Sequence, residues 1–343
     1  MTHPNPIPSL PAERRERERL DWARNALGDA AATLVRASVD AGFRSYWRSQ
    51  GAGPSHIVMD SPPGVEDVRP WLRIRDLLEG GGVRVPRVLA RDVERGFLLL
   101  EDLGQQTYLQ VLDAGNADAL FDAAIGQLLK LQAIAPPDEL PTYDEALLAR
   151  ELRLFDEWFL GTHLQLPPDC GGMEVLDGAY RRLIDAALAQ PRVLVHRDFM
   201  PRNLMPADDG PAVLDFQDAV RGPIAYDVLS LFKDAFASWP EARVDAWRER
   251  YRERAAAAGL PMPDAARFRR DFDWIGIQRH LKVIGIFARL CHRDGKPKYL
   301  ADVPRFFDYL DAVLPRYREF DDLRRWLDAR VKPAIAAHAE AGS

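Results

Sequence analysis

The stretch "VLVHRDFMPRNLMPADDGPAVLDFQD", which runs from Val193 to Asp218, decides the fold. It places three polar residues, Asp198, Asn203 and Asp215, among short apolar runs typical of strands. Their carboxylate and amide oxygens are hard ligands suited to Mg²⁺, and two of them can suffice when the ion is shared with substrate phosphates. The remaining carboxylate can accept a hydrogen bond from an attacking hydroxyl.

The spacing of these residues is specific. The tripeptide His196–Asp198 is followed by four residues and then Asn203, which is the pattern of a protein-kinase catalytic loop. Asp215 follows the first aspartate by 17 positions (215 − 198 = 17), and Gln217 stands where the kinase D-F-G motif has glycine. Polar residues that only cap turns are the alternative interpretation. The joint match, together with the order of the surrounding elements, favours phosphoryl transfer.

Chain length, net charge and cysteine content limit the class of protein. The chain has 343 residues, enough for two lobes, and its net charge of -6 argues against a general nucleic-acid binder. Cys170 and Cys291 form no C-x-x-C pair and are typical of reduced thiols. Because no apolar run could span a bilayer and residues 1–20 lack the apolar core of a signal peptide, we expect a cytoplasmic protein without a membrane partner.

The first part of the chain is rich in predicted strands. Turn signals and β-type composition predict strands at 33–40, 43–50, 55–60, 87–92 and 97–104, with helices at 11–27 and 64–82. The remainder is predicted to be helical at 117–135, 144–161, 174–190 and from about 225 onward, interrupted by short strands at 193–195, 204–205 and 212–216. We therefore expect an α+β fold of two lobes. A small five-stranded antiparallel β lobe covers residues 1–103, and a larger, mostly helical lobe covers 104–343.

Five stretches carry a resemblance to a known family. They are "IVMDSPP" (Ile57–Pro63), "GFLLLEDLG" (Gly96–Gly104), "HRDFMPRNLM" (His196–Met205), "LDFQDAVRGPIAYD" (Leu214–Asp227) and "QRHLKVIGIFARLCHRDGKPKYL" (Gln278–Leu300). Over nearly its whole length the chain resembles the aminoglycoside-phosphotransferase-like kinases, relatives of the protein kinases with the same two-lobed fold. Within that family it looks most like the bacterial anomeric sugar kinases that phosphorylate N-acetylmuramate and N-acetylglucosamine in peptidoglycan recycling.

The resemblance implies an activity and roles for named residues. It implies an enzyme that uses ATP and Mg²⁺ to phosphorylate a small amino sugar, with ATP bound by the N-terminal lobe. Asp198 would be the catalytic base, and Asn203 and Asp215 would be the metal ligands. The segment "LLLEDLG" resembles the kinase hinge, so the backbone of Glu101 and Leu103 would bind the adenine edge.

One part of the kinase pattern is missing. Kinases place a phosphate-binding lysine on the third strand, but the matching "SHIVMD" has none. We favour Arg44 and Arg48 as replacement cations over the arginines at 69, 73 and 75, and solvated surface charges are the alternative interpretation. The phosphate-covering loop has a single glycine, Gly42. The predicted nucleotide site comprises Gly42, Arg44, Arg48, Met59, Glu101 and Leu103.

The acceptor sugar is expected to contact the segment after Gln278. Its polar residues suit a neutral or anionic sugar, because a cation can pair with the lactyl carboxylate of N-acetylmuramate. The alternative interpretation of this segment is a core helix whose polar side faces solvent. The predicted sugar contacts are Trp158, Gln217, Arg279, His280 and Lys282, and Arg202, beside Asn203, is a catalytic candidate by position alone. Asp227, at a helix start, is interpreted as a structural brace for the catalytic loop.

Other functions stay open at this point. An aminoglycoside kinase, or a kinase of another small alcohol, would have the same catalytic loop but should offer carboxylates to a polycation. A nucleotide-binding pseudokinase is supported only by the missing lysine. The sequence does not rank N-acetylmuramate against N-acetylglucosamine, fix the anomer or give the oligomeric state.

Overall fold

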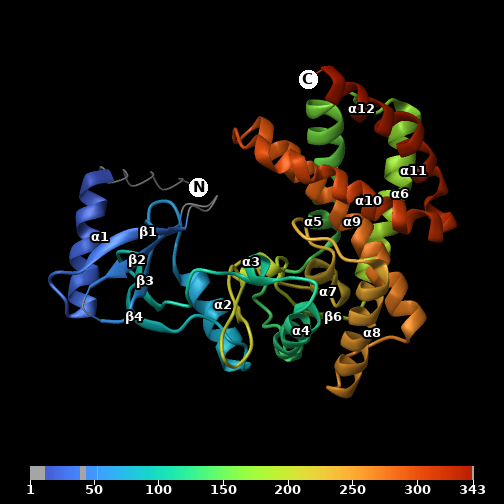
Figure 1. The fold of residues 1–343 in the computed structure, drawn as a ribbon. Coiled ribbons are helices and arrows are strands. Elements are labelled where there is room, and N and C mark those ends of the chain that lie inside the picture. Colours follow the sequence, from blue (N-terminus) through green and yellow to red (C-terminus); the bar gives the residue numbers. More distant parts are fainter. Residues whose placement is uncertain (1–11, 39–43, 52, 342–343) are drawn as a thin grey trace. The chain divides into compact units, whose positions relative to one another are not determined.

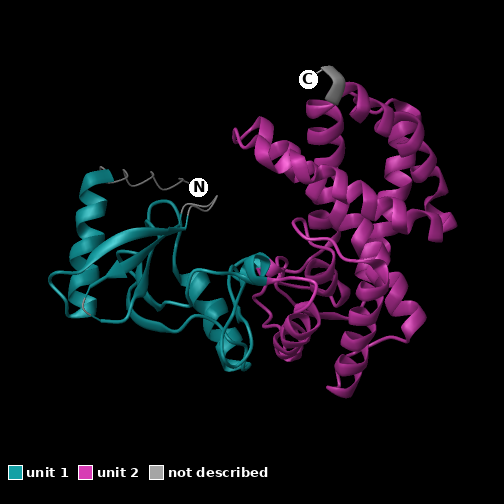
Figure 2. Cartoon of the chain, viewed as in Figure 1, with its two compact units in different colours: residues 1–111, 202–218 teal, residues 112–201, 219–343 magenta. Residues whose placement is uncertain are grey.

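The computed structural model describes residues 12–38, 44–51 and 53–341. By their packing the residues fall into two compact units, one formed by 1–111 with 202–218 and the other by 112–201 with 219–343 (Figure 2). The predicted division at residue 103 stays a prediction. No helix in the described part of the chain is both long and apolar enough to cross a membrane.

The first unit is built on a five-stranded antiparallel sheet, as predicted (Figure 1). Its strands are β1 (Thr33–Ser38), β2 (Ser45–Gln50), β3 (His56–Asp60), β4 (Val88–Asp92) and β5 (Phe97–Glu101), in the order β1-β2-β3-β5-β4. The helix α1 (Ala12–Leu27) precedes the sheet, α2 (Arg69–Gly80) connects β3 to β4, and the short α3 (Tyr108–Val111) follows β5.

Apolar residues of the sheet and of α1 form the core of this unit. Trp22 of α1 stacks on Phe97 of β5 with ring centroids 5.5 Å apart, and Val58 and Leu99 complete the buried cluster. Asp60, at the end of β3, accepts hydrogen bonds from two arginines of α1. The helix and the sheet are therefore joined by apolar burial and by a partly buried ion-pair cluster.

The segment 202–218 belongs to the same unit and forms a small hairpin. Its strands are β7 (Leu204–Met205) and β8 (Ala212–Val213), and η2 (Pro201–Asn203) precedes them. Val213 donates to the carbonyl of Arg84 at 2.8 Å, and the Phe216 ring lies 5.1 Å from that of Trp71. The predicted strand 212–216 was too long, because Asp215 adopts φ 63°, a left-handed conformation that a strand cannot continue.

The second unit is mostly helical. Its helices are α4 (Ala117–Ala133), α5 (Glu145–Leu154), η1 (Phe155–His163), α6 (Cys170–Leu188), α7 (Ala225–Phe232), α8 (Glu241–Ala257), α9 (Ala265–His292), η3 (Pro297–Asp302), α10 (Val303–Val313), η4 (Leu314–Arg316), η5 (Arg318–Phe320), α11 (Asp321–Trp326), η6 (Leu327–Val331) and α12 (Lys332–Ala341). Its two strands, β6 (Arg192–Val195) and β9 (Val220–Pro223), pair antiparallel. The strand β9 was not predicted, and its "VRGP" contains glycine and proline, which are unfavourable inside strands.

The 28-residue helix α9 is the central element of this unit and packs against α5, η1, α6, α7 and α10 (Figure 1). Gly285 lies against the backbone of Leu154 and Phe155, so close that a Cβ would overlap it. At that junction the predicted single helix 144–161 changes from α-helical to π-helical hydrogen bonding. The helix is buried on several sides although its sequence is not continuously apolar, and Gln278, Arg279 and Lys282 are among its buried residues.

Candidate active site

The loop His196–Asp198 leaves β6 and is held by a buried carboxylate. Asp227 of α7 is fully buried, and it accepts hydrogen bonds from the backbone N–H groups of His196 at 2.7 Å and Arg197 at 3.0 Å. Arg197 has φ 76°, which is unfavourable for a residue with a Cβ, so these bonds offset a strained turn. Burial raises the pKa of Asp227 to about 6, against the opposing effect of His196 and the two backbone bonds. The predicted bracing role of Asp227 is confirmed.

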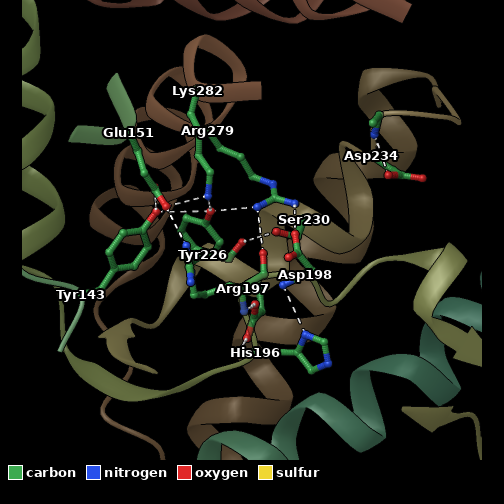
Figure 3. Close-up of polar contacts among 12 residues, drawn as sticks. Tyr143, Glu151, His196, Arg197, Asp198, Tyr226, Ser230, Asp234, Arg279 and Lys282 are labelled. Atoms are coloured by element: carbon green, nitrogen blue, oxygen red, sulfur yellow. Dashed lines mark hydrogen bonds and ion pairs between the residues drawn. The ribbon is translucent and has the colours of Figure 1, made fainter. Parts of the chain in front are cut away.

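Asp198 lies beside a cation from the central helix (Figure 3). Arg279 Nη2 is 3.3 Å from Asp198 Oδ1. The same guanidinium donates through Nη1 to the carbonyl of Arg197 and to the hydroxyl of Tyr226, each at 2.8 Å. The Asp198 side chain is 44% exposed, whereas that of Arg279 is 8% exposed. The carboxylate is therefore accessible to solvent, and the guanidinium that contacts it is buried.

The charges around Asp198 favour its ionised form. Burial by itself would raise the pKa of this carboxyl, but the charges of Arg279, Lys282, His196 and Arg197 outweigh that effect and lower it. Asp198 is therefore a carboxylate at neutral pH. An ionised, solvent-accessible carboxylate is able to orient a hydroxyl and to accept its proton.

A second layer of buried polar groups supports this arrangement (Figure 3). Glu151 of α5 forms ion pairs with Arg197 at 2.8 Å and with Lys282 at 2.9 Å, and it accepts a hydrogen bond from the hydroxyl of Tyr143. Lys282 also donates to the hydroxyl of Tyr226 at 3.0 Å. The cations of α9 and of the catalytic loop are therefore matched by carboxylates, as buried charges require.

The metal-ligand candidates belong to the other compact unit. The backbone N–H of Leu214 donates to the backbone carbonyl of Asn203 at 2.9 Å. The β7–β8 hairpin therefore brings the backbone next to Asp215 close to that of Asn203. The Asp215 side chain is exposed, and Gln217 donates to its Oδ1 at 2.8 Å. Their amide and carboxylate oxygens are of the kind that Mg²⁺ binds. Within the described ranges no three His, Cys, Asp or Glu side chains gather as a metal-binding group, and the predicted two-ligand site stays a prediction.

The structure describes five of the six nucleotide-site candidates, and Gly42 lies outside the described residues. Arg44 pairs with Glu66 at 3.1 Å. Arg48 pairs with Asp102 at 2.6 Å and donates to the carbonyl of Gly104 at 2.7 Å, so it holds the segment after β5.

The remaining nucleotide-site candidates lie on or next to the central strands of the sheet. Met59 is fully buried within β3. Glu101, at the end of β5, has its carboxylate paired with Arg84 and Arg87, and its backbone N–H donates to the carbonyl of Arg87. Leu103 is half-buried in the segment that follows. Their roles toward a nucleotide stay predictions.

The acceptor candidates separate into different surroundings. Arg279 and Lys282 join the Asp198 cluster. His280 faces elsewhere on α9, where its buried ring lies 4.9 Å from that of Tyr309 and 5.6 Å from that of Phe306, and burial lowers its pKa well below the usual value. Trp158 is half-buried in η1, whereas Gln217 and the catalytic candidate Arg202 belong to the other compact unit.

Sequence reasoning missed several members of the cluster. Glu151, Tyr143 and Tyr226 were not identified, although Tyr226 lies in the quoted stretch "GPIAYD". The only available signal for Glu151 was an acidic residue in the otherwise apolar or basic run "ARELRLF". Its partners come from distant parts of the chain, so no local spacing reveals them.

Comparisons with known proteins agree with this fold. Among solved structures, the ADP-bound aminoglycoside phosphotransferase APH(2'')-Ib superposes with a TM-score of 0.58 at 14% identity, covering 85% of this chain and 97% of that one. The choline kinase LicA from Streptococcus pneumoniae superposes with a TM-score of 0.60 at 14% identity, covering 86% and 99%. At this identity the likeness shows the fold, and it confirms the predicted α+β, protein-kinase-like architecture.

Sequence relatives are much more similar. A protein from Pseudomonas putida described as an N-acetylmuramate/N-acetylglucosamine kinase is 54% identical over 301 residues, which is 87% of this chain and 89% of the relative. A protein of the same description from Neisseria meningitidis is 43% identical over 88% of this chain and 92% of the relative. The family model described as "Phosphotransferase enzyme family" matches residues 33–269. The chain therefore belongs to the phosphotransferase enzyme family.

Proposed function

We propose that this enzyme transfers the γ-phosphoryl group of ATP to the anomeric hydroxyl of N-acetylmuramate, N-acetylglucosamine or both. The observation that carries the proposal is the 54% identity, over most of both chains, to a relative described as an N-acetylmuramate/N-acetylglucosamine kinase. The supporting observation is an accessible carboxylate, Asp198, held by buried cations. Because ATP is a cytoplasmic substrate, we place the activity in the cytoplasm, in the recycling of cell-wall amino sugars.

The chemistry asked of Asp198 is modest. A hemiacetal hydroxyl at C1 is more acidic than an ordinary alcohol, so a carboxylate is a sufficient base for it. Asp198 accepts a hydrogen bond from this hydroxyl, orients its oxygen for attack and takes the proton late in the transfer. Arg279 keeps the carboxylate in place, and Asp227 keeps the loop in the strained conformation that presents it.

Other residues would hold the nucleotide and its metal. The amide oxygen of Asn203 and the carboxylate of Asp215 would bind Mg²⁺, which when bound supplies positive charge to the β- and γ-phosphates. The backbone at Glu101 and Leu103 would bind the adenine edge, and Arg44 and Arg48 are the candidate phosphate cations.

The charges near Asp198 weigh against the second candidate, an aminoglycoside kinase. Arg197, Arg279 and Lys282 are gathered next to the catalytic carboxylate. The neighbouring carboxylate of Glu151 is already paired with Arg197 and Lys282, so it is not offered to a polycationic acceptor, whereas a neutral N-acetylglucosamine needs no such carboxylate.

A substrate panel tests the proposal. ATP consumption should be measured with N-acetylmuramate, N-acetylglucosamine, glucose, choline and kanamycin, for the wild type and for Asp198→Asn. We expect turnover with one or both N-acetylated sugars, little with the other compounds, and loss of turnover in the variant. Preferential turnover of kanamycin or choline would overturn the proposed substrate class.

A further inference from the structure

Arg279 is anchored mainly by groups other than Asp198. Its Nη1 donates at 2.8 Å to the backbone carbonyl of Arg197 and at 2.8 Å to the hydroxyl of Tyr226. Its Nη2 then lies 3.3 Å from the Asp198 carboxylate. The guanidinium thus connects α9, α7 and the catalytic loop, and its orientation is set by two neutral oxygens (Figure 3).

Lys282, one turn further along α9, stabilises the same anchor. Its ammonium group donates to Tyr226 at 3.0 Å and pairs with Glu151 at 2.9 Å, and its side chain is 8% exposed. Tyr226 is therefore a shared acceptor for both cations of the helix. Both cations therefore have hydrogen-bond acceptors within the protein itself.

We propose that Arg279 is a positioning residue for the phosphoryl transfer: its guanidinium, anchored on Tyr226 and on the carbonyl of Arg197, orients the Asp198 carboxylate and stabilises its negative charge. This assignment replaces the sugar contact predicted for Arg279 from the sequence. It rests on the proposed function for its place in the reaction, but the contact itself is a property of the free protein.

The electrostatic consequence follows from the charged groups around Asp198. They include Arg279 and Lys282 of α9 and His196 and Arg197 of the loop, and these contact Tyr226 and Asp227 of α7 and Glu151 of α5 in turn. Burial raises the pKa of Asp198, and Arg279 makes the largest opposing contribution. Removal of the Arg279 charge therefore raises this pKa, and a larger fraction of Asp198 becomes protonated in mildly acidic buffer.

The direct test is the titration of Asp198 in the folded protein without nucleotide. Carboxyl carbons of labelled aspartate are followed by ¹³C NMR, and the Asp198 signal is identified as the one that Asp198→Asn removes. Arg279→Gln should raise its midpoint by roughly 1–2 pH units, whereas Arg279→Lys, which keeps the charge, should stay closer to the wild type. The control is Arg269→Gln, on the same helix but paired with Asp245, which should leave the midpoint unchanged.

Kinetics supply a second readout. Arg279→Gln should lower kcat by roughly 10–100-fold, change the sugar KM by less than about threefold, and move the acidic limb of the kcat profile to higher pH. Arg279→Lys should restore the acidic limb. Its kcat should stay below the wild-type value, because an ammonium group does not reproduce the planar guanidinium contacts.

Two results would overturn the assignment. One is an unchanged Asp198 midpoint together with an unchanged acidic limb, and the other is a rise in sugar KM at constant kcat, which would mark Arg279 as a sugar ligand. If Arg279→Gln does not fold, Arg279→Lys decides, because a wild-type kcat in that variant contradicts the role. Absence of sugar turnover in the wild type would instead reject the proposed function, and the NMR titration would still test the contact.

Discussion

Glu151 is the buried carboxylate that links the α9 cations to the catalytic loop. It pairs with Lys282 and with Arg197, and its own residue is 6% exposed. Burial by itself would raise the pKa of Glu151, but the charges of Lys282 and Arg197 outweigh this effect and lower it. The loop that carries Asp198 is therefore linked to α5 and α9 by this ion-pair cluster.

Replacement of Glu151 by alanine should destabilise the protein strongly. The change leaves the buried Lys282 and the partly buried Arg197 without their shared carboxylate, and breaking a buried pair in this way costs about 3–5 kcal/mol. Urea unfolding should show this loss of unfolding free energy, whereas Arg150→Ala, at an exposed position of the same helix, should change it by less than about 0.5 kcal/mol. Equal stabilities of the two variants would show that the cluster does not support the fold.

Replacement of Asp198 by asparagine should remove the base and leave the fold intact. An amide occupies nearly the same space but cannot take up the sugar proton, so kcat should fall by roughly 10²–10⁴-fold. ATP affinity, measured by calorimetry, should stay within about threefold of the wild-type value. A variant that retains most of its turnover would exclude Asp198 as the base.

At the scale of single residues, the sequence predicted those features that depend on local spacing. Asp198 was predicted as the base from its spacing to Asn203, which matches a kinase catalytic loop, and Asp227 was predicted as a brace because it begins a helix next to that loop. Glu151 was missed because Lys282 and Arg197 meet it only after folding. The different surroundings of Arg279 and His280 were missed for the same reason: the two residues are neighbours in sequence, but their side chains contact different parts of the protein.

At the scale of elements, the close contact between α9 and the α5–η1 junction sets how the central helix packs. The contact is possible because residue 285 has no side chain. An added methyl group would overlap the carbonyl of Leu154 and lie 2.6 Å from the backbone N of Phe155. Backbone atoms in the middle of two packed helices cannot move aside as a side chain can.

Gly285→Ala should therefore destabilise the protein although alanine favours helices. The gain in helix propensity is about 1 kcal/mol, and the overpacking cost is typically 1–3 kcal/mol and should lie near the upper end here. The control is Gly276→Ala on the same helix, where the nearest atom is Leu229 Cδ1 at 3.0 Å, the end of a flexible side chain. Thermal unfolding should show a lower Tm for Gly285→Ala than for Gly276→Ala, and the reverse order would contradict this packing.

The elements were predicted best where periodicity is strong. The five strands of the sheet and α1 lie close to their predicted positions, because alternation and turn residues mark them. The strand β9 was missed because it depends on pairing with β6, which is distant in the sequence. The predicted end of β8 was wrong because Asp215 adopts a left-handed conformation. The π-helical η1 has no known local signature, and its start coincides with the packing point of Gly285.

The stability of the whole molecule should respond to mild acid through His163, which lies next to two other histidines. His163 lies at the end of η1. Its Nδ1 is 3.1 Å from Nε2 of His292 of α9, and its ring centroid is 4.5 Å from that of His338 of α12. Burial, followed by the charges of His338 and His292, lowers the pKa of His163 to about 4. The unfolded chain therefore binds more protons than the folded one between about pH 6.5 and pH 4, and stability falls as the pH falls through this window.

His163→Phe should weaken this pH dependence. The variant keeps an aromatic ring but has no proton to bind, so its Tm should fall less than that of the wild type between pH 7 and pH 5, by roughly 2–4 °C. Differential scanning calorimetry at both pH values measures the difference. Parallel Tm changes in the two proteins would show that His163 does not contribute to the acid sensitivity.

The division into a β-rich part and a helical part was also evident from composition along the chain. The sequence did not reveal that residues 202–218 pack with the β-rich unit, because that assignment depends on contacts with Arg84 and Trp71. It placed Asn203 and Asp215 in the helical lobe on grounds of chain order alone.

We predict that this phosphotransferase acts on the anomeric position of an N-acetylated amino sugar. The most direct measurement is the NMR spectrum of the product formed from ¹³C-labelled N-acetylglucosamine or N-acetylmuramate with ATP and Mg²⁺. We predict that the phosphorus couples to C1 and its proton, with no phosphate elsewhere on the ring. Coupling to C6 or to another ring position, or no phosphorylated sugar at all, would contradict the account.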